Sequence, residues 1–288
     1  MKLLAVIIST LIITLCTYAR STEDIQSCGE IVIAVYNDFR PYSYMENGEA
    51  KGIDVEIGKH IAASLNVKPK WYFTEADENL DDDLRNVVWK GNPVHKTRAD
   101  VMLRIPYDYD YMRQVDATSG ELQTEMVAIK SPYHAEKWVI VTHKDVIPKV
   151  NTLGIFAYHT IGVELDTLPD KHLSMKNGGL LRKNVKRYAK FDDAVLDFKA
   201  GKIDSLAGLK SQVEFLLDYN NNQDKYTMTN EVLGIKSIWD IGIAVRSDYR
   251  DLSYHIDGVI TELHENKILE KIFDTYHVTY TKPISYGP

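Results

Sequence analysis

The sequence predicts an α/β protein made of two lobes, and three observations support this. Runs rich in β-branched residues alternate with segments that carry apolar residues at helical spacing, which is typical of βαβ units around a parallel sheet. Roughly 265 residues follow the N-terminal leader, enough for two lobes of about 100 to 150 residues that each bury a core. A charged, tyrosine-rich stretch separates the two series of elements.

The N-terminal leader is typical of a secretory signal peptide. Lys2 is followed by an apolar run from Leu3 to Tyr18, and small or polar residues end the run. About 16 apolar residues are fewer than the roughly 20 that a membrane-spanning helix needs. We expect cleavage near Ala19 (signal peptide 1–19) and a periplasmic location. Lipid attachment at Cys16 stays open as an alternative, although the residue before it is not small.

Composition and motif content exclude several classes of function. The formal net charge of -7 offers no basic stripe to nucleic acid. Two cysteines are too few for a cysteine-rich metal site, the nine histidines form no HExxH motif, and no glycine-rich phosphate loop precedes a helix. No nucleophile with a neighbouring base stands out. We therefore expect a monomer that binds a small molecule, with no enzyme activity, cofactor, metal or nucleic-acid partner.

A first series of elements follows the leader. A β-branched strand opens it, and the chain then breaks at Asn37-Asp38-Phe39-Arg40-Pro41. The expected elements are strands at 30–35, 70–73 and 99–105, helices at 54–65 and 79–89, and an irregular loop at 106–123. Two extended segments, 125–130 and 137–142, should carry the chain into the second lobe.

A second series of elements builds the other lobe and then returns. The expected elements are strands at 160–163, 187–189 and 205–209, helices at 178–183, 192–200 and 211–219, a turn at 220–224, a returning strand at 241–245, and helices at 252–263 and 268–275. Lobe 1 would then comprise residues 29–135 plus 240–288, and lobe 2 residues 136–239.

Short motifs at successive steps of this pattern carry a resemblance. They are Phe39-Arg40-Pro41-Tyr42-Ser43-Tyr44, Gly52-Ile53-Asp54-Val55, Ala99-Asp100-Val101-Met102, Ser131-Pro132-Tyr133, Ile161-Gly162-Val163, Ala200-Gly201-Lys202-Ile203-Asp204 and Gly242-Ile243-Ala244-Val245-Arg246. In this order, the chain resembles the family 3 extracellular solute-binding proteins, the periplasmic receptors of amino-acid-type ABC transporters. The resemblance implies a fold like that of type II periplasmic binding proteins. In such a fold, two doubly wound lobes joined by a two-strand hinge close over a solute that passes to a permease.

Candidate ligand contacts in lobe 1 begin at the end of the first strand. Phe39 lies where the resemblance implies an aromatic ring against the ligand, and Arg40 and Tyr42 follow it. Arg104 lies in an otherwise apolar strand, so its charge must meet an anion. That anion is either a ligand carboxylate, which suits a bidentate guanidinium, or an acid of the neighbouring loop such as Asp108.

The tyrosine-rich loop and lobe 2 supply further candidates. Pro106, Tyr107 and Asp108 are nearest the strand end, where rings and a carboxylate could hold a ligand or simply form a surface loop. On lobe 2, Thr167 follows the strand that carries Gly162, where the resemblance implies hydroxyl or amide contacts to the ligand.

Two departures from the family pattern bear on the ligand. The arginine that binds the α-carboxylate in amino-acid receptors has no match close to Ser131, because Arg113 lies 18 residues before it. Where those receptors carry an aspartate for the α-ammonium, this chain has Lys210, unless that lysine simply begins a helix. Together with Arg104, Lys210 favours a carboxylate-bearing or anionic ligand over an ordinary amino acid.

Two other functions stay open on the same fold. Similar receptor-like proteins accompany periplasmic quinoprotein alcohol dehydrogenases as accessory proteins, and the tyrosine-rich loop would suit a protein partner. Cyclohexadienyl dehydratases add a general acid inside such a cleft, and a cleft carboxylate with a raised pKa would support that function.

Overall fold

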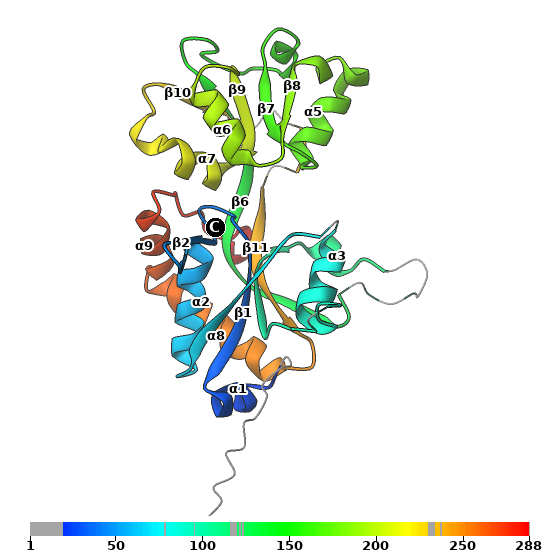
Figure 1. Cartoon of the computed structure of the whole chain (residues 1–288), viewed down its shortest axis with the longest axis vertical. Helices are drawn as coiled ribbons and strands as arrows, with labels where there is room; N and C mark the ends of the chain where they lie inside the picture. The colour runs from blue at the N-terminus through cyan, green and yellow to red at the C-terminus, as the bar shows by residue number, and fades with distance from the viewer. Residues whose placement is uncertain are drawn as a thin grey trace, which may run out of the picture.

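The structure is a computed structural model with two lobes. It describes residues 20–77, 79–94, 96–115, 120, 122, 124–229, 234–236 and 238–287. The expected signal peptide lies outside these residues. Figure 1 shows the lobes placed end to end along the long axis, with strands passing between them. No helix in the described part of the chain is long and apolar enough to cross a membrane.

Lobe 1 contains the strands β4-β1-β5-β11-β6 in that spatial order. Strand β1 is parallel to both neighbours, whereas β11 runs antiparallel to β5 and β6. The bounds are β1 (Glu30–Tyr36), β4 (Lys68–Thr74), β5 (Val101–Tyr107), β6 (Val127–His143) and β11 (Ile238–Arg246), with a separate hairpin of β2 (Tyr44–Glu46) and β3 (Glu49–Lys51).

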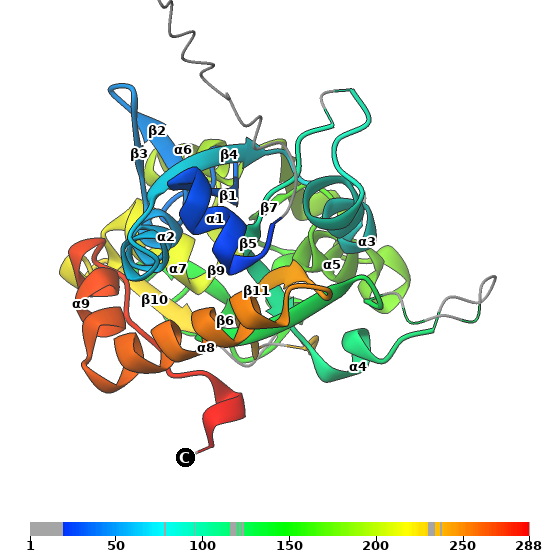
Figure 2. The ribbon, with the colours of Figure 1, turned by 90° about the horizontal axis from the view of Figure 1, so that it is seen from below.

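Helices cover both faces of the lobe 1 sheet. Figure 2 shows α2 (Ile53–Ser64) and α9 (Ile268–Thr275) on one side of β1, and α3 (Leu80–Asp83) on the other. Helix α3 continues as a π-helical turn, η1 (Leu84–Trp89). Alternate residues of β1 point to opposite faces, so Ile33 packs with α2 and α8 (Arg250–Glu265), and Ala34 packs with η1.

Lobe 2 extends the sheet in the order β6-β9-β7-β8, and β10 pairs with β6. Strand β7 is parallel to β8 and β9, so the carboxyl ends of these strands share one edge. The bounds are β7 (Ile161–Glu164), β8 (Val185–Tyr188), β9 (Ser205–Leu209), β10 (Tyr226–Thr229), α5 (Leu168–Gly179), α6 (Phe191–Lys199), α7 (Lys210–Leu217), and the 3-10 turns η2 (Leu153–Ala157), η3 (Arg182–Asn184) and η4 (Tyr219–Asn221). Separate apolar clusters form its core. The predicted two-lobed α/β fold is confirmed.

One strand, β6, runs through both lobes. Up to Lys137 it pairs with β11, and from Trp138 onward it pairs with β9. We expected two separate extended segments here, and this was wrong. The strand does not break, because β9 begins to pair with it at the residue after the last one that pairs with β11. The lobe boundaries after residues 135 and 239 stay predictions.

The helix expected at 178–183 was also placed wrongly. The structure has α5 ten residues earlier, starting at Leu168 after the N-cap Thr167. Gly178 and Gly179 have φ values of 67° and 85°, and such left-handed glycines end helices rather than begin them.

The tyrosine-rich loop is more regular than its composition predicted. Pro106 and Tyr107 extend β5, and the short helix α4 (Tyr109–Met112) follows, capped by the Asp108 side chain. The elements that were not predicted include α1 (Thr22–Cys28) in the polar segment before β1, the β2–β3 hairpin, the turn η2, and β10 after the turn at 220–224. The 3-10 turn η5 (Ile284–Tyr286) ends the described chain.

Gly52, at the start of α2, permits a close backbone contact with lobe 1 residue Tyr42. Its φ is +125°, and a Cβ placed there would lie 2.1 Å from the carbonyl oxygen of Tyr42. We predict that Gly52→Ala lowers the free energy of unfolding by at least about 3 kcal/mol, measured by urea denaturation. Gly48→Ala is the matched control, because Gly48 also has a positive φ but has no atom within 4 Å of its Cβ position. The control should lose about 1 kcal/mol. Equal losses in the two variants would contradict this account.

Candidate functional site

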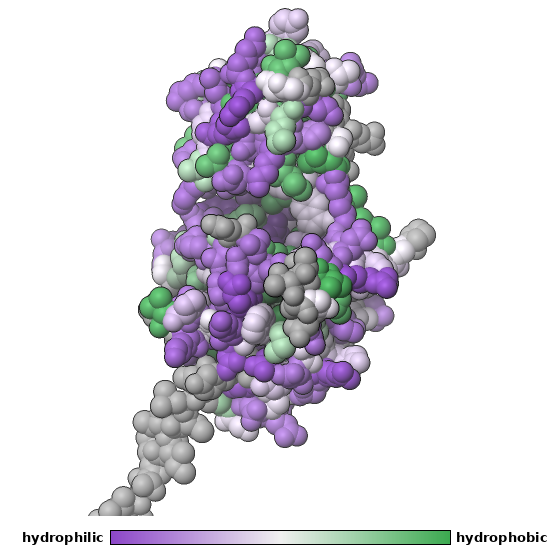
Figure 3. Space-filling view, turned by 90° about the vertical axis from the view of Figure 1, so that its right-hand side faces the viewer, coloured by the Kyte–Doolittle hydropathy of each residue, from purple (hydrophilic) through white to green (hydrophobic). Residues whose placement is uncertain are grey.

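A cavity of about 710 Å³ lies between the two lobes. Figure 3 shows the molecule hollowed at this level. Its walls come from the carboxyl ends of parallel strands in both lobes, the edge where α/β sheets usually bind ligands. The lining residues are Tyr36, Asn37, Asp38, Phe39, Glu75, Ala76, Asp77, Asn79, Leu80, Asp83, Arg104, Pro106, Trp138, Glu164, Ala189, Lys190, Phe191, Asp192, Leu209, Gln212, Trp239 and Ile241.

Arg104 reaches the centre of the cavity from β5. Its backbone has a φ of 67°, beside a register shift between β5 and β11 at Gly242. Its guanidinium carbon lies 3.4 Å from the ring centroid of Tyr42 and 4.7 Å from that of Phe39. Arg104 is only 6% exposed, and its Nη1 atom is buried without a hydrogen-bond partner. The guanidinium therefore contacts both rings, as cation–π attraction favours.

Glu136 on β6 balances the charge of Arg104. It is 1% exposed, lies 3.5 Å from Arg104 Nη2, and accepts a hydrogen bond of 2.8 Å from the hydroxyl of Tyr42. The hydroxyl of Ser211 on α7 also donates to it. Burial alone would raise the pKa of Glu136, but His134, Arg104 and the Ser211 donor outweigh burial and lower it. Glu136 thus joins lobe 1, lobe 2 and the cavity arginine.

Three carboxylates form the lobe 1 wall of the cavity, which we call the lobe 1 acidic wall: Glu75, Asp77 and Asp83. Neutral groups hold each of them. Glu75 accepts from Asn37 at 2.7 Å, Asp77 from the amide of Asn86 at 2.8 Å, and Asp83 from the hydroxyl of Tyr36 at 2.8 Å. Burial is the main reason why the pKa of Asp83 lies above its ordinary value, and the negative charge of Asp77 raises it further.

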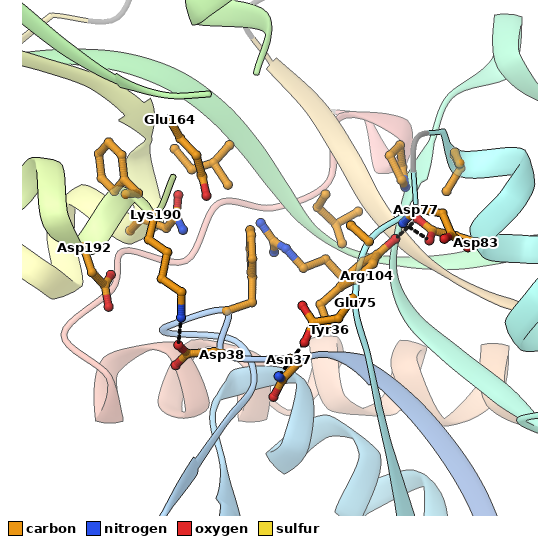
Figure 4. Close-up of a pocket in the computed structure, with 18 of the residues that line it drawn as sticks. Tyr36, Asn37, Asp38, Glu75, Asp77, Asp83, Arg104, Glu164, Lys190 and Asp192 are labelled. Carbon is orange, nitrogen blue, oxygen red and sulfur yellow. Dashed lines mark hydrogen bonds and ion pairs between the residues drawn. The ribbon is translucent and has the colours of Figure 1, made fainter. Parts of the chain in front are cut away.

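Two further carboxylates, Glu164 and Asp192, form the lobe 2 acidic wall. Glu164 ends β7, and Asp192 lies in the first turn of α6. Burial, followed by the charge of Asp192, raises the pKa of Glu164, and burial is also the largest cause of the raised pKa of Asp192. Figure 4 shows this pair on one side of the cavity and the lobe 1 acidic wall on the other, with Arg104 between them.

The second cationic side chain of the cavity, Lys190, is paired across the cleft. Its ammonium lies 2.8 Å from Asp38 of lobe 1, as Figure 4 shows. Arg40 also pairs with Asp38. Both cations that line the cavity therefore have a carboxylate partner, and the two acidic walls have none among the ion pairs of the described residues.

Three of the nine predicted ligand contacts line the cavity: Phe39, Arg104 and Pro106. Tyr42 lies immediately behind them, fully buried under Arg104. Arg40 packs over the ring of Tyr44 at 4.5 Å, pairs with Asp38, and is not among the lining residues.

The remaining four predicted contacts have local structural partners. Tyr107 ends β5 opposite Asp240. Asp108 caps α4 and pairs with Lys236, and Thr167 caps α5. Lys210 pairs with Glu214 one turn along α7. These four are not among the lining residues, and whether any of the nine contacts ligand stays a prediction.

The sequence reasoning missed most of the acidic lining. A usable signal was present, because Asp38, Glu75, Glu164 and Asp192 each lie at, or within a few residues of, the end of a parallel strand. Counting charges at those strand ends would have shown an acidic site. Among the described residues, no group of three or more His, Cys, Asp or Glu side chains could hold a metal ion.

The chain belongs to the bacterial extracellular solute-binding proteins, family 3, whose model matches residues 31–279. Solved structures with the same fold include an ancestral cationic amino acid solute-binding protein, with 15% identity and a TM-score of 0.68 over 89% of this chain and 99% of that chain. An amino acid ABC transporter substrate-binding protein from Streptococcus pneumoniae, bound to L-arginine, has 20% identity and a TM-score of 0.63 over 91% and 100%.

A truncated, arginine-bound ArgBP from T. maritima is also similar, with 25% identity and a TM-score of 0.55 over 84% of this chain and 99% of that chain. No curated protein matches the chain. The family binds small molecules and works with ABC transporter permeases, so the resemblance inferred from the motifs is confirmed.

Asp54, which begins α2 behind the site, is a buried acid with an incomplete set of partners. It is 0% exposed, one oxygen accepts from the hydroxyl of Tyr133 at 2.7 Å, and the other has no partner. Burial raises its pKa to about 7, against the opposing effects of Arg104 and Tyr133.

This raised pKa predicts a pH-dependent stability. The pKa of Asp54 in the folded protein lies above the roughly 3.9 of an unfolded aspartate, so folding favours the protonated side chain. The resulting contribution to the unfolding free energy is complete below about pH 4 and is lost as the pH rises to about 7. Between pH 4 and 8 the native chain should lose about 2 to 4 kcal/mol of unfolding free energy relative to Asp54→Asn, because asparagine does not titrate. Urea unfolding at both pH values measures it, with exposed Asp193→Asn as the control. A difference that does not change with pH would rule the explanation out.

Proposed function

We propose that the chain is a periplasmic receptor that captures a small organic cation between its lobes and delivers it to an ABC transporter permease. The signal peptide cleaved near Ala19, the periplasmic location and the monomeric state are parts of this proposal. Family membership supports the receptor role, since family members and the similar solved structures are substrate-binding proteins. A receptor needs a cleft rather than a catalytic group, and the interlobe cavity meets that need.

The charge of the cavity lining carries the choice of a cation. Six carboxylates line the cavity against two cationic side chains. Arg104 is balanced by Glu136 and Lys190 by Asp38, so the carboxylates of the lobe 1 and lobe 2 acidic walls have no ion-pair partner among the described residues. Asp192 is influenced by positive charges nearby, those of Arg40 and Lys190, and burial still raises its pKa. Closing such a cavity around an anion would bury uncompensated like charges, whereas a cation would supply the missing partner.

The expected carboxylate-bearing or anionic ligand therefore gains little support. Arg104 was its main basis, and that guanidinium already has Glu136 and two rings around it. Lys210, the other basis, is paired with Glu214 away from the lining. What remains is the Nη1 donor of Arg104, which can serve one oxygen of a ligand without offering a free charge.

A dehydratase is the second candidate, and one observation favours it. Glu164 faces the cavity and has a raised pKa, the property expected of a general acid. The same raised pKa follows from burial and from the charge of Asp192, and a bound cation would offset both effects. The two functions differ in outcome: an assay for dehydration of cyclohexadienyl acids detects turnover only for the enzyme, and loss of that turnover in Glu164→Gln would establish it.

The receptor function predicts a charge preference that calorimetry can measure. We expect amines and guanidines to bind, and di- and tricarboxylates not to bind. A cation at 100 times its dissociation constant should add about 2.7 kcal/mol to the unfolding free energy. Binding should weaken as salt rises, because screening reduces the attraction of the acidic walls. Tight binding of a carboxylate, with no binding of any cation, would contradict the proposal.

A further inference from the structure

The carboxylates without counter-charge are divided between two walls that face each other across the cavity. Glu164 and Asp192 belong to lobe 2, while Glu75, Asp77 and Asp83 belong to lobe 1 (Figure 4). In each wall one carboxylate adds to the effect of burial on another: Asp192 raises the pKa of Glu164, and Asp77 raises the pKa of Asp83. A ligand with one charge could neutralise only one of them.

Apolar side chains line the cavity beside the two acidic walls. Phe39, Trp239, Phe191 and Ile241 line it, and Trp239 packs on Trp138 with ring centroids 5.4 Å apart. An apolar lining suits methylene groups and offers ring faces to a passing cation. The cavity thus combines two acidic walls with apolar surface, and the paired guanidinium of Arg104 lies between the walls.

No free positive charge on the lining awaits a ligand carboxylate. Arg104 and Lys190 are paired, as described above. Arg113 lies outside the lining, where its guanidinium packs over the ring of Tyr109 at 4.9 Å and donates to the hydroxyl of that tyrosine. A carboxylate on the ligand would therefore be buried among like charges.

From this arrangement we propose that the ligand is a linear dication without a carboxylate, an α,ω-diamine or its guanidino equivalent. One cationic group binds Glu164 and Asp192, the other binds the lobe 1 acidic wall, and the chain between them packs on the aromatic rings of the lining. This inference rests on the proposed function and narrows it. It also explains how a ligand could favour closure, because only the closed cleft brings both walls to one molecule.

Calorimetry with matched probes tests this inference. The dications are 1,4-diaminobutane, 1,5-diaminopentane and agmatine. The monocations are n-butylamine and n-pentylamine, and L-arginine is agmatine with a carboxylate added. We expect at least one diamine to bind about 10-fold or more tightly than the monoamine of equal carbon number, since a second charged contact is typically worth about one decade. Agmatine should bind at least as tightly as L-arginine.

Variants assign the two ends. Glu164→Gln with Asp192→Asn should reduce diamine affinity to that of the monoamine, while changing monoamine affinity by less than about 3-fold, because the lobe 1 wall still binds one ammonium. Glu75→Gln with Asp77→Asn should remove the same advantage from the other end. Asp193→Asn is the control, because Asp193 is an exposed neighbour of Asp192 outside the lining.

The outcomes separate the dication proposal from the broader proposal that the ligand is an organic cation. Monoamines that bind as tightly as every diamine would overturn the dication and leave the organic cation standing. L-arginine binding about 10-fold tighter than agmatine would also overturn it, by showing a carboxylate contact. If none of these cations binds, both proposals fall.

Discussion

The buried pair of Glu136 and Arg104 is the interaction on which the cleft depends. Glu136 lies on β6, the strand common to both lobes, and accepts hydrogen bonds from Tyr42 of lobe 1 and Ser211 of lobe 2. A buried carboxylate without partners would lower the free energy of unfolding, so Glu136 constrains the positions of the groups that donate to it. Arg104 is one of those partners, and its contact with Glu136 holds it against Phe39 in the cavity wall.

That pair also determines the charge that a ligand meets. Glu136 does not line the cavity, so it neutralises Arg104 from behind, and the carboxylates of the two acidic walls stay without an ion-pair partner among the described residues. If Arg104 were free, the same cavity would suit an anion or an ordinary amino acid. The proposed preference for a cation therefore depends on Glu136 of β6 as much as on the two acidic walls.

Much of the fold could be predicted because local patterns decide it. The β-branched run of β1 is buried on both faces, and the amphipathic spacing of α2 predicted that helix within about one residue at each end. The predictions of element boundaries were wrong where strand pairing or helix capping sets those boundaries. The continuity of β6 depends on a change of partner at Lys137, and the position of α5 depends on the cap at Thr167.

The site was harder to predict than the fold. Arg104 and Phe39 were found because a charge in an apolar strand and a ring at a strand end are local signals. That Glu136 would balance Arg104 was not predictable, because 32 residues separate them in a sequence that gives no pairing information. Asp108, the loop acid considered instead, is committed to α4 and Lys236.

The central claim is that the carboxylates of the two acidic walls lack an ion-pair partner until a cation binds. The most direct test is a carbon-13 NMR titration of the Glu164 carboxyl group, assigned by its loss in Glu164→Gln. The account predicts a pKa above the ordinary glutamate value in the free protein, and a fall in that pKa when 1,5-diaminopentane is added, because a nearby cation favours the charged form. A pKa at or below the ordinary value in the free protein would show that the carboxylate is already balanced and would contradict the account.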